Sequence, residues 1–401
     1  MSAASRAKRL TIVLGTAAIA LLSAAQADAL QATDVSKTAG IYEISRTRGA
    51  TVFDYDGDGW EDALIGRHYD GFYRLYRNNR DRTFTEISET AFPESERHIR
   101  DPHECASADV NQDGSADLYC TVGGERGEGP NPKHLWIQQP DGTFLLRTGQ
   151  YGVADRWGRG RRATFLNANG DSYPDLFVGN VYPRADGHRS PNRLFINVGG
   201  ERFRPARDYH VDREVGSNSV QAIDYNRDGR DDLFLCGKDG LHVYKNIRFD
   251  HFRNVTHGLR ARMKCEYGVL GYMNRDRRPD LVRVTGSSLR VHLFANGGFR
   301  KPPFHLDLGG GREAAIGNVN GDGLDDIYYL RSGPPGEDRR DVMLLNSRAG
   351  HRFREMDIPQ ARKGVGEAVT TIDYDHNGLD DFIVENGHRH WPGPIRLVAF
   401  G

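Results

Sequence analysis

The chain has 401 residues, of which 47 are glycine and 10% are aromatic, and its formal net charge is −1. This length fits one large all-β domain or two to three ordinary domains. The nearly neutral charge excludes a general electrostatic attraction to nucleic acid, so we expect no nucleic-acid partner.

Residues 1–29 have the features of a secretory signal peptide. Three basic residues precede an apolar run from Leu10 to Leu22, and the segment ends in the small-residue cleavage site Ala27-Asp28-Ala29. The alternative, a membrane anchor, is disfavoured because the run is too short to span a bilayer, and no other segment is apolar enough. We therefore expect a secreted protein, periplasmic or at the cell surface in a bacterium, with its folded domain over residues 30–401.

A nine-residue acidic loop pattern recurs seven times along the folded part. The first copy, Asp54–Asp62, places carboxylates at positions 1, 3, 5 and 9 and a glycine at position 6. The copies are about 53 residues apart, a period typical of propeller blades. They begin at Asp54, Asp109, Asn167, Asp224, Tyr272, Asn318 and Asp373. Apolar segments flank each loop, so the loop joins two antiparallel strands and cannot be an EF-hand, which needs flanking helices and a carboxylate at position 12.

Two more strand signals follow in the repeats. The expected third strands lie at 74–77, 134–137, 193–196, 242–245, 290–293 and 342–345, and the fourth strands begin at Phe84, Phe144, Phe203, Phe252, Phe304 and Phe353. The last repeat ends after its third strand at Phe400, while residues 33–39 match the fourth-strand segment 85–91. We therefore predict an all-β, seven-bladed β-propeller in which an N-terminal strand completes the last blade, which removes open sheet edges.

Four loops carry three or four carboxylates, which repel one another unless a cation neutralises them. Alternating oxygen ligands suit Ca²⁺, and abundant extracellular calcium favours a structural ion that pins the turn. The expected ligands are Asp54, Asp56, Asp58 and Asp62 in loop one; Asp109, Asn111, Asp113 and Asp117 in loop two; Asp224, Asn226, Asp228 and Asp232 in loop four; and Asp373, Asp375, Asn377 and Asp381 in loop seven.

The remaining three loops depart from the pattern. Weaker calcium sites are expected in loop six, with Asn318, Asn320, Asp322 and Asp326, and as an open possibility in loop three, with Asn167, Asn169, Asp171 and Asp175. In loop five an aromatic residue, Tyr272, stands at position 1 and three arginines fill the turn. We expect no ion there and hypothesise that an arginine pairs instead with Asp276 and Asp280.

The four cysteines suit disulfides in an oxidising compartment. Of the three possible pairings, we favour Cys105 with Cys120 and Cys236 with Cys265, because each pair falls near the same end of one repeat or of neighbouring repeats.

The repeated D-x-[DN]-x-[DN]-G-x-x-D string before a short apolar strand resembles the FG-GAP/VCBS repeats that build the propeller of integrin α subunits. Segments such as Asp175–Asn180 and Arg193–Asn197 resemble most the cartilage-acidic-protein (ASPIC) branch, without its extra C-terminal domain. The resemblance covers nearly all of the folded part and implies a calcium-binding propeller. It leaves the function open, because this scaffold hosts adhesion modules, lectins and some enzymes.

The face opposite the calcium loops is expected to hold the ligand site. Its long loops carry arginines, which grip carboxylate or sulfate, with aromatic and histidine side chains. The candidate residues are His68, Tyr69, Arg100, His103, Arg156, Trp157, Arg159, Arg184, His390 and Trp391. The favoured function is an extracellular binding or adhesion module for a protein or an acidic glycan. The alternative is a polysaccharide lyase or hydrolase, in which His68, Tyr69, His103 or His390 would act as base, and a clustered set of histidines could instead hold a transition metal.

Overall fold

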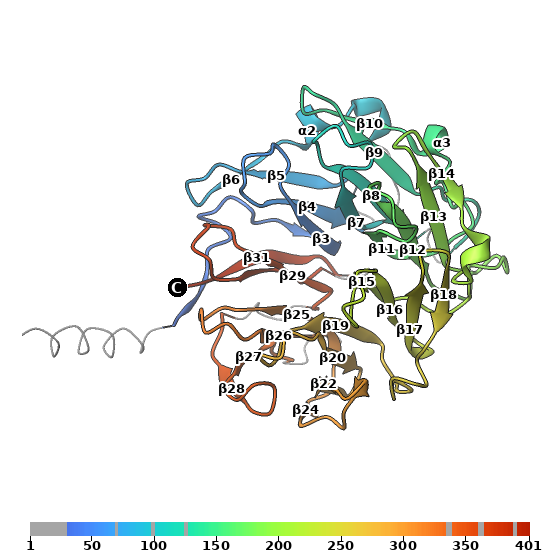
Figure 1. Cartoon of the computed structure of the whole chain (residues 1–401). Coiled ribbons are helices and arrows are strands. Elements are labelled where there is room, and N and C mark those ends of the chain that lie inside the picture. The colour runs from blue at the N-terminus through green and yellow to red at the C-terminus, as the bar shows by residue number, and fades with distance from the viewer. Residues whose placement is uncertain are drawn as a thin grey trace, which may run out of the picture.

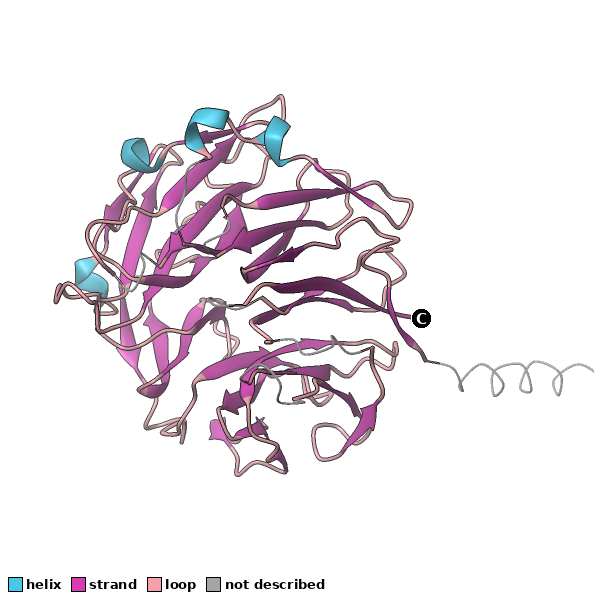
Figure 2. Cartoon of the chain, turned by 180° about the vertical axis from the view of Figure 1, so that it is seen from behind, coloured by secondary structure: helices cyan, strands magenta, loops and turns pink. Residues whose placement is uncertain are grey.

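The computed structural model describes residues 30–68, 71–97, 101–123, 127–333, 339–359, 365–387 and 391–401. The expected signal peptide, residues 1–29, lies outside the described residues. Seven antiparallel sheets surround one axis as the blades of a propeller, which confirms the predicted fold (Figure 1). Figure 2 shows that strands make up almost all of the regular structure, and that the few short helices lie at the periphery.

Six blades run outward from the axis in chain order, and in blade seven the N-terminal strand β1 is the outermost. The first strands, nearest the axis, are β3 (Thr47–Phe53), β7 (Pro102–Ala108), β11 (Gly160–Leu166), β15 (Ser219–Ile223), β19 (Tyr267–Gly271), β25 (Gly311–Gly317) and β29 (Ala368–Ile372). The second strands are β4 (Asp62–Arg67), β8 (Asp117–Val122), β12 (Asp175–Asn180), β16 (Asp232–Gly237), β20 (Asp280–Thr285), β26 (Asp326–Arg331) and β30 (Asp381–Glu385).

The third and fourth strands form the outer half of each blade. The third strands are β5 (Arg74–Asn78), β9 (His134–Gln138), β13 (Arg193–Val198), β17 (Gly240–Ile247), β21 (Ser288–His292), β27 (Val342–Asn346) and β31 (Gly393–Phe400). The fourth strands are β6 (Phe84–Glu86), β10 (Phe144–Leu146), β14 (Arg202–Pro205), β18 (His251–Asn254), β24 (Phe304–Leu306), β28 (Phe353–Met356) and β1 (Ala32–Asp34).

A few elements lie outside this scheme. Blade five carries an extra hairpin of β22 (Phe294–Ala295) and β23 (Gly298–Phe299), which the sequence analysis missed, and β2 (Ile44–Ser45) pairs with β31. The short helices are α2 (Ser88–Ala91), η1 (Glu94–Glu96), α3 (Thr148–Tyr151) and η2 (Arg207–Tyr209). No helix among the described residues is long and apolar enough to cross a membrane.

The core is divided among the interfaces between neighbouring blades, which we call seams. The described residues form seven buried apolar clusters, and each cluster combines side chains of two adjacent blades. The ring is closed as predicted: β1 pairs antiparallel with β31 inside blade seven, so that Ala32 lies opposite Phe400 and Asp34 opposite Val398.

Both predicted disulfides are present. Cys105–Cys120 joins directly opposed residues of β7 and β8 within blade two. Cys236–Cys265 joins β16 of blade four to the segment that precedes β19 of blade five, so it crosses the seam between these blades.

Candidate functional site

The four loops with aspartate at position 1 and glycine at position 6 share one hydrogen-bond pattern. In loop one the Asp54 carboxylate accepts the backbone N–H groups of Asp58 (3.0 Å) and Gly59 (2.9 Å). Asp109, Asp224 and Asp373 make the same two bonds in loops two, four and seven, at 2.7 to 3.0 Å. The position-1 carboxylate therefore holds these four turns in one shape.

Two observations on the described loops fit a bound cation. In loops one and seven, three carboxylates place ligand oxygens within 4.8 Å of one another: Asp54, Asp56 and Asp58, and Asp373, Asp375 and Asp381. In loops four and seven, Oδ1 of Asp228 and Oδ1 of Asp375 are buried without a hydrogen-bond donor among the described residues. Crowded and orphaned carboxylate oxygens are the ligands that Ca²⁺ takes, so the residues present suit this ion.

Nearby side chains neutralise part of this charge. Arg80 pairs with Asp58, Arg82 lies 3.4 Å from Asp375, and Lys245 lies 2.9 Å from Asp228. In loop two, by contrast, no described cationic side chain forms an ion pair with Asp109 or Asp113. Among the described residues, loop two therefore lacks the cationic partner that loops one, four and seven each have.

The fifth loop does not contain the arginine pair that we expected. No arginine within the described loop 272–280 forms an ion pair with Asp276 or Asp280. Arg275 instead donates to the backbone carbonyl of Asp322 in the next loop (3.0 Å), and Asp276 accepts the backbone N–H of Arg278 (2.9 Å). Arg275 is thus turned toward the next loop, and the backbone of the turn itself satisfies Asp276.

Position 9 has an architectural role that sequence reasoning missed. In all seven loops its aspartate is buried and accepts a backbone N–H at 2.6 to 2.8 Å, from the third strand of its own blade in six blades and from Phe294 of β22 in blade five. Burial is the main cause that raises the pKa of this group, to about 7 for Asp62 and to about 8 for Asp381. Loop five keeps this bond although it lacks an acid at position 1, so position 9 is retained for the fold as well as for any ion.

The third strand ends in an amide side chain that connects two blades. Asn197 of blade three donates through Nδ2 to the carbonyl of Val110 in blade two (2.8 Å). Equivalent bonds cross four more seams, from Asn78, Gln138, Asn246 and Asn346. Phe294 and Phe400 stand at this position in blades five and seven.

On the face opposite the loops, charged side chains close the axial channel. Irregular register, as in a β-bulge, interrupts the inner strands of blades one, two, three and six at this end, and bulges re-aim side chains. The resulting ion pairs are Arg48–Glu367, Arg162–Glu104, Arg162–Glu313 and Arg312–Glu367. They leave a cavity of only about 90 Å³, so the centre of this face is a network of paired charges rather than an open site.

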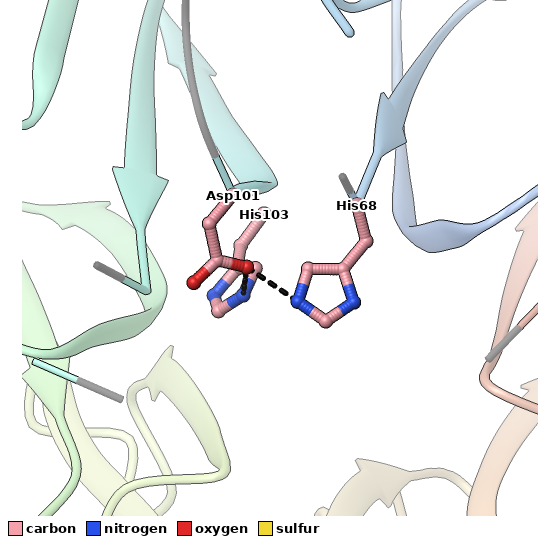
Figure 3. Close-up of side chains that lie close together, drawn as sticks. All are labelled: His68, Asp101 and His103. Atoms are coloured by element: carbon pink, nitrogen blue, oxygen red, sulfur yellow. Dashed lines mark hydrogen bonds and ion pairs between the residues drawn. The ribbon is translucent and has the colours of Figure 1, made fainter. Parts of the chain in front are cut away.

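Three candidate side chains cluster beside this network (Figure 3). His68 and His103 both face Oδ1 of Asp101, at 3.2 Å from Nε2 of His103, and Asp101 lies between them. His103 donates from Nδ1 to the carbonyl of Gly160 (2.9 Å), and its Nε2 faces the Arg161 guanidinium (3.0 Å). The cluster therefore joins blades one, two and three.

The protonation of this cluster follows from its burial. Burial, with Arg161 nearby, lowers the pKa of His103 well below its usual value, and burial also lowers the pKa of His68. A neutral His103 that donates from Nδ1 accepts at Nε2, where Arg161 lies. The three ligand atoms lie within 4.8 Å of one another, and the residue types suit a transition metal. Because Arg161 already occupies the imidazole lone pair, we interpret the cluster as a polar lock between blades.

An exposed aromatic platform lies farther out on the same face. Trp157 precedes β11 at the end away from the acidic loop 167–175 and is 42% exposed. His188 stacks on its ring, with 4.1 Å between centroids and 15° between planes, and the buried Arg184 lies 5.6 Å from the ring centroid. Arg184 also donates to the Trp157 carbonyl (2.8 Å), so the platform is rigidly supported.

The candidate ligand residues thus differ in their exposure to solvent. Arg156, Trp157 and Trp391 are exposed, and Arg159 is partly buried. The expectation of an accessible side chain is wrong for His68, His103 and Arg184, which are buried. Tyr69, Arg100 and His390 lie outside the described residues.

Comparisons with known proteins agree with this architecture. Residues 54–120 and 167–235 match the FG-GAP-like repeat family. The fold is similar to that of an Agrocybe aegerita lectin that recognises non-reducing terminal N-acetylglucosamine (TM-score 0.52, 15% identity, 79% of this chain and 80% of the lectin covered). It is also similar to BBS1N in complex with ARL6DN (TM-score 0.52, 10% identity, 88% of this chain and 92% of the other covered). At these identities the likeness concerns the fold alone. No curated protein matches the sequence.

Proposed function

Because this chain is a β-propeller that carries FG-GAP-like repeats, we propose that it is a secreted, calcium-binding module that binds an extracellular protein or glycan. Two disulfides suit an oxidising compartment. The repeated loops would hold structural calcium, with the position-1, -3 and -5 side chains as the principal oxygen ligands. Calcium would then stabilise the turns on one face and leave the other face for the partner.

The observation that carries the binding role is the Trp157 platform. The stacked His188 and the buried Arg184 hold the exposed Trp157 ring in place, and an aromatic face held in this way covers apolar sugar surface or a partner side chain well. The alternative of polysaccharide cleavage has no comparable support, since His68 and His103 are buried and hydrogen bonded within the fold.

Affinity electrophoresis in native gels that contain acidic or neutral polysaccharides tests the binding role. We expect retardation of the calcium-loaded protein and its loss in Trp157→Ala. Tyr272→Ala is the matched control, because Tyr272 is equally exposed (47%) but lies in the fifth loop, on the opposite face. Equal retardation of both variants would contradict the platform, and shortened polysaccharide would favour the enzyme.

A melting experiment tests the calcium role separately. An ion at a hundredfold excess over its Kd adds about 2.7 kcal/mol per site to the stability of the native state. A chelator should therefore lower the melting temperature, and Asp109→Ala should reduce the calcium-induced shift. Identical melting with calcium and with chelator would contradict calcium binding.

A further inference from the structure

Two adjoining hollows surround the outer strand of blade four. One, of about 520 Å³, lies between the β16–β17 turn and the segment that leads into blade five. The other, of about 700 Å³, lies between β17, β18 and the segment that follows blade three. Both are lined by His242 and Asn254, so the two hollows adjoin, and we call them together the blade-four groove.

The blade-four groove is strongly basic although the chain as a whole is nearly neutral. Six exposed cationic side chains line it, against two acidic ones: Lys238, Arg262 and Lys264 in the first hollow, and Arg189, Arg213 and Arg253 in the second. Four of the chain's 15 histidines, at positions 210, 242, 251 and 257, lie along the same walls. Cations gathered in a concave surface concentrate the field and attract an anionic ligand.

The two acidic residues are engaged by the protein itself. Asp239 accepts the Tyr182 hydroxyl (2.6 Å) and the Gly216 backbone N–H (2.8 Å). Glu214 accepts the Ser190 backbone N–H (2.7 Å) and pairs with Arg189 (3.0 Å). Their carboxylates fix the loops that shape the groove, and five of the six cations form no ion pair with them.

The groove continues toward the Trp157 platform. The segment between β12 and β13 carries Tyr182, whose ring lies 3.8 Å below Nζ of Lys238, and His188, which stacks on Trp157. Arg189, next to His188, lines the groove. One extended ligand could therefore contact the cationic groove and the aromatic ring together.

We propose that the blade-four groove binds an acidic polysaccharide, with its sulfate or carboxylate groups on the groove cations and a sugar face on Trp157. This inference rests on the proposed binding function and names its partner class. Arginine forks bind two oxygens of a carboxylate or of a tetrahedral oxyanion through paired hydrogen bonds, and the rigid Trp157 ring suits a sugar. A nucleic acid would call for several stacking rings along its path.

The test compares retention of the full mature protein on immobilised dextran sulfate, polygalacturonate and neutral dextran. The protein is made without N-glycosylation, because Asn254-Val255-Thr256 is a sequon on the groove wall and a glycan there would fill the groove. We expect binding to one or both acidic polymers and none to neutral dextran. Retention on dextran sulfate alone assigns sulfate, and retention on polygalacturonate alone assigns carboxylate.

The groove variant carries Lys238→Glu, Arg262→Glu and Lys264→Glu. Its affinity for the acidic polymer should fall on the order of tenfold or more, since three favourable charge contacts become repulsive. The matched control reverses three exposed charges at the edge of blade six, Arg348→Glu, Arg352→Glu and Arg354→Glu, which changes the net charge equally. Equal losses in both variants, or none in either, would overturn the proposal, as would retention of the wild type on single-stranded DNA but on neither acidic polymer.

The same samples separate the groove from the proposed function. Each variant is melted with calcium and with chelator to show that it folds. If the groove variant binds the acidic polymer as the wild type does while Trp157→Ala does not, the proposed groove site is wrong but the proposed binding function is supported. If neither acidic polymer retains the wild-type protein, the proposed groove site is also wrong, but the protein could still be a binding module for a protein partner.

Discussion

Loss of the Cys236–Cys265 disulfide should open the seam between blades four and five. This seam lacks two side-chain links that other seams use on the face of the acidic loops. The first link is the amide side chain described above, and Phe294 takes its place here. The second link is a carboxylate at loop position 8 that accepts a backbone N–H from the loop of the preceding blade, and here Pro279 occupies that position. The carboxylates that form this link in other blades are Glu61, Asp231, Asp325 and Asp380. The disulfide crosses this same seam, so the Cys236→Ala and Cys265→Ala double variant is the informative perturbation.

The chain-entropy relation gives the magnitude. Removal of Cys236–Cys265, with its separation of 29 residues, should lower the free energy of unfolding by about 3.6 kcal/mol. Removal of Cys105–Cys120, with its separation of 15 residues, should lower it by about 3.0 kcal/mol. Entropy alone therefore separates the two double variants by only about 0.6 kcal/mol. Any further loss at Cys236–Cys265 measures how far the seam depends on the bond.

Guanidinium denaturation of both double variants, with limited proteolysis, provides the assay. The Cys105–Cys120 pair lies within one blade and serves as the control. We expect the variant without Cys236–Cys265 to lose more stability than the variant without Cys105–Cys120, by more than the entropic difference of about 0.6 kcal/mol. We also expect the protease to cut it first in residues 255–266, between the blades. Losses that agree within about 0.6 kcal/mol, with the same first cleavage site, would refute the reasoning.

Three further outcomes are expected. Asn197→Ala removes the donor to the Val110 carbonyl and should cost about 2–3 kcal/mol in urea denaturation; a cost below about 0.5 kcal/mol would contradict the link. Burial raises the pKa of Glu385 to about 7 from an ordinary value of 4.5, so the native state binds the extra proton between these pH values and loses stability as pH rises through them. Between pH 5 and 8 the free energy of unfolding of Glu385→Gln should therefore rise by up to about 3 kcal/mol relative to that of the wild type. If the two proteins show parallel dependence of stability on pH, this effect is excluded. A Cβ on Gly123 would lie 2.4 Å from Cε1 of His103, so Gly123→Ala should cost about 1–3 kcal/mol and expose blade two to hydrogen exchange, whereas unchanged protection would show that the cluster adapts.

The repeating features of the fold were predictable because a short local sequence pattern within each repeat specifies each of them. The spacing of the loops gave seven blades, the Phe-led segments gave the fourth strands, and the match between residues 33–39 and 85–91 gave the closure that β1 and β31 form. Both disulfides followed from where the cysteines fall in the repeat. These inferences needed only the period and the alternation of strands.

The sites that depend on several blades were not predictable in the same way. The ion pairs of the channel arise where inner strands lose regular register, as at Arg48 and Arg162, and a shift of one residue exchanges the two faces of a strand. A glycine within two residues of the arginine, as at Gly49 and Gly160, is a local trace of this irregularity. The blade-four groove collects cations from segments up to 75 residues apart, Arg189 to Lys264, which only the closed ring brings together.

The strand pair that closes the ring also sets how the domain would respond to mechanical load. Residue 32 lies opposite residue 400 and residue 34 opposite residue 398, so the two strands leave the pair at the same end. A force that pulls these two ends apart would break the pair one hydrogen bond at a time, as in a zipper, instead of shearing all bonds together. A tether through both ends would therefore open blade seven at low force.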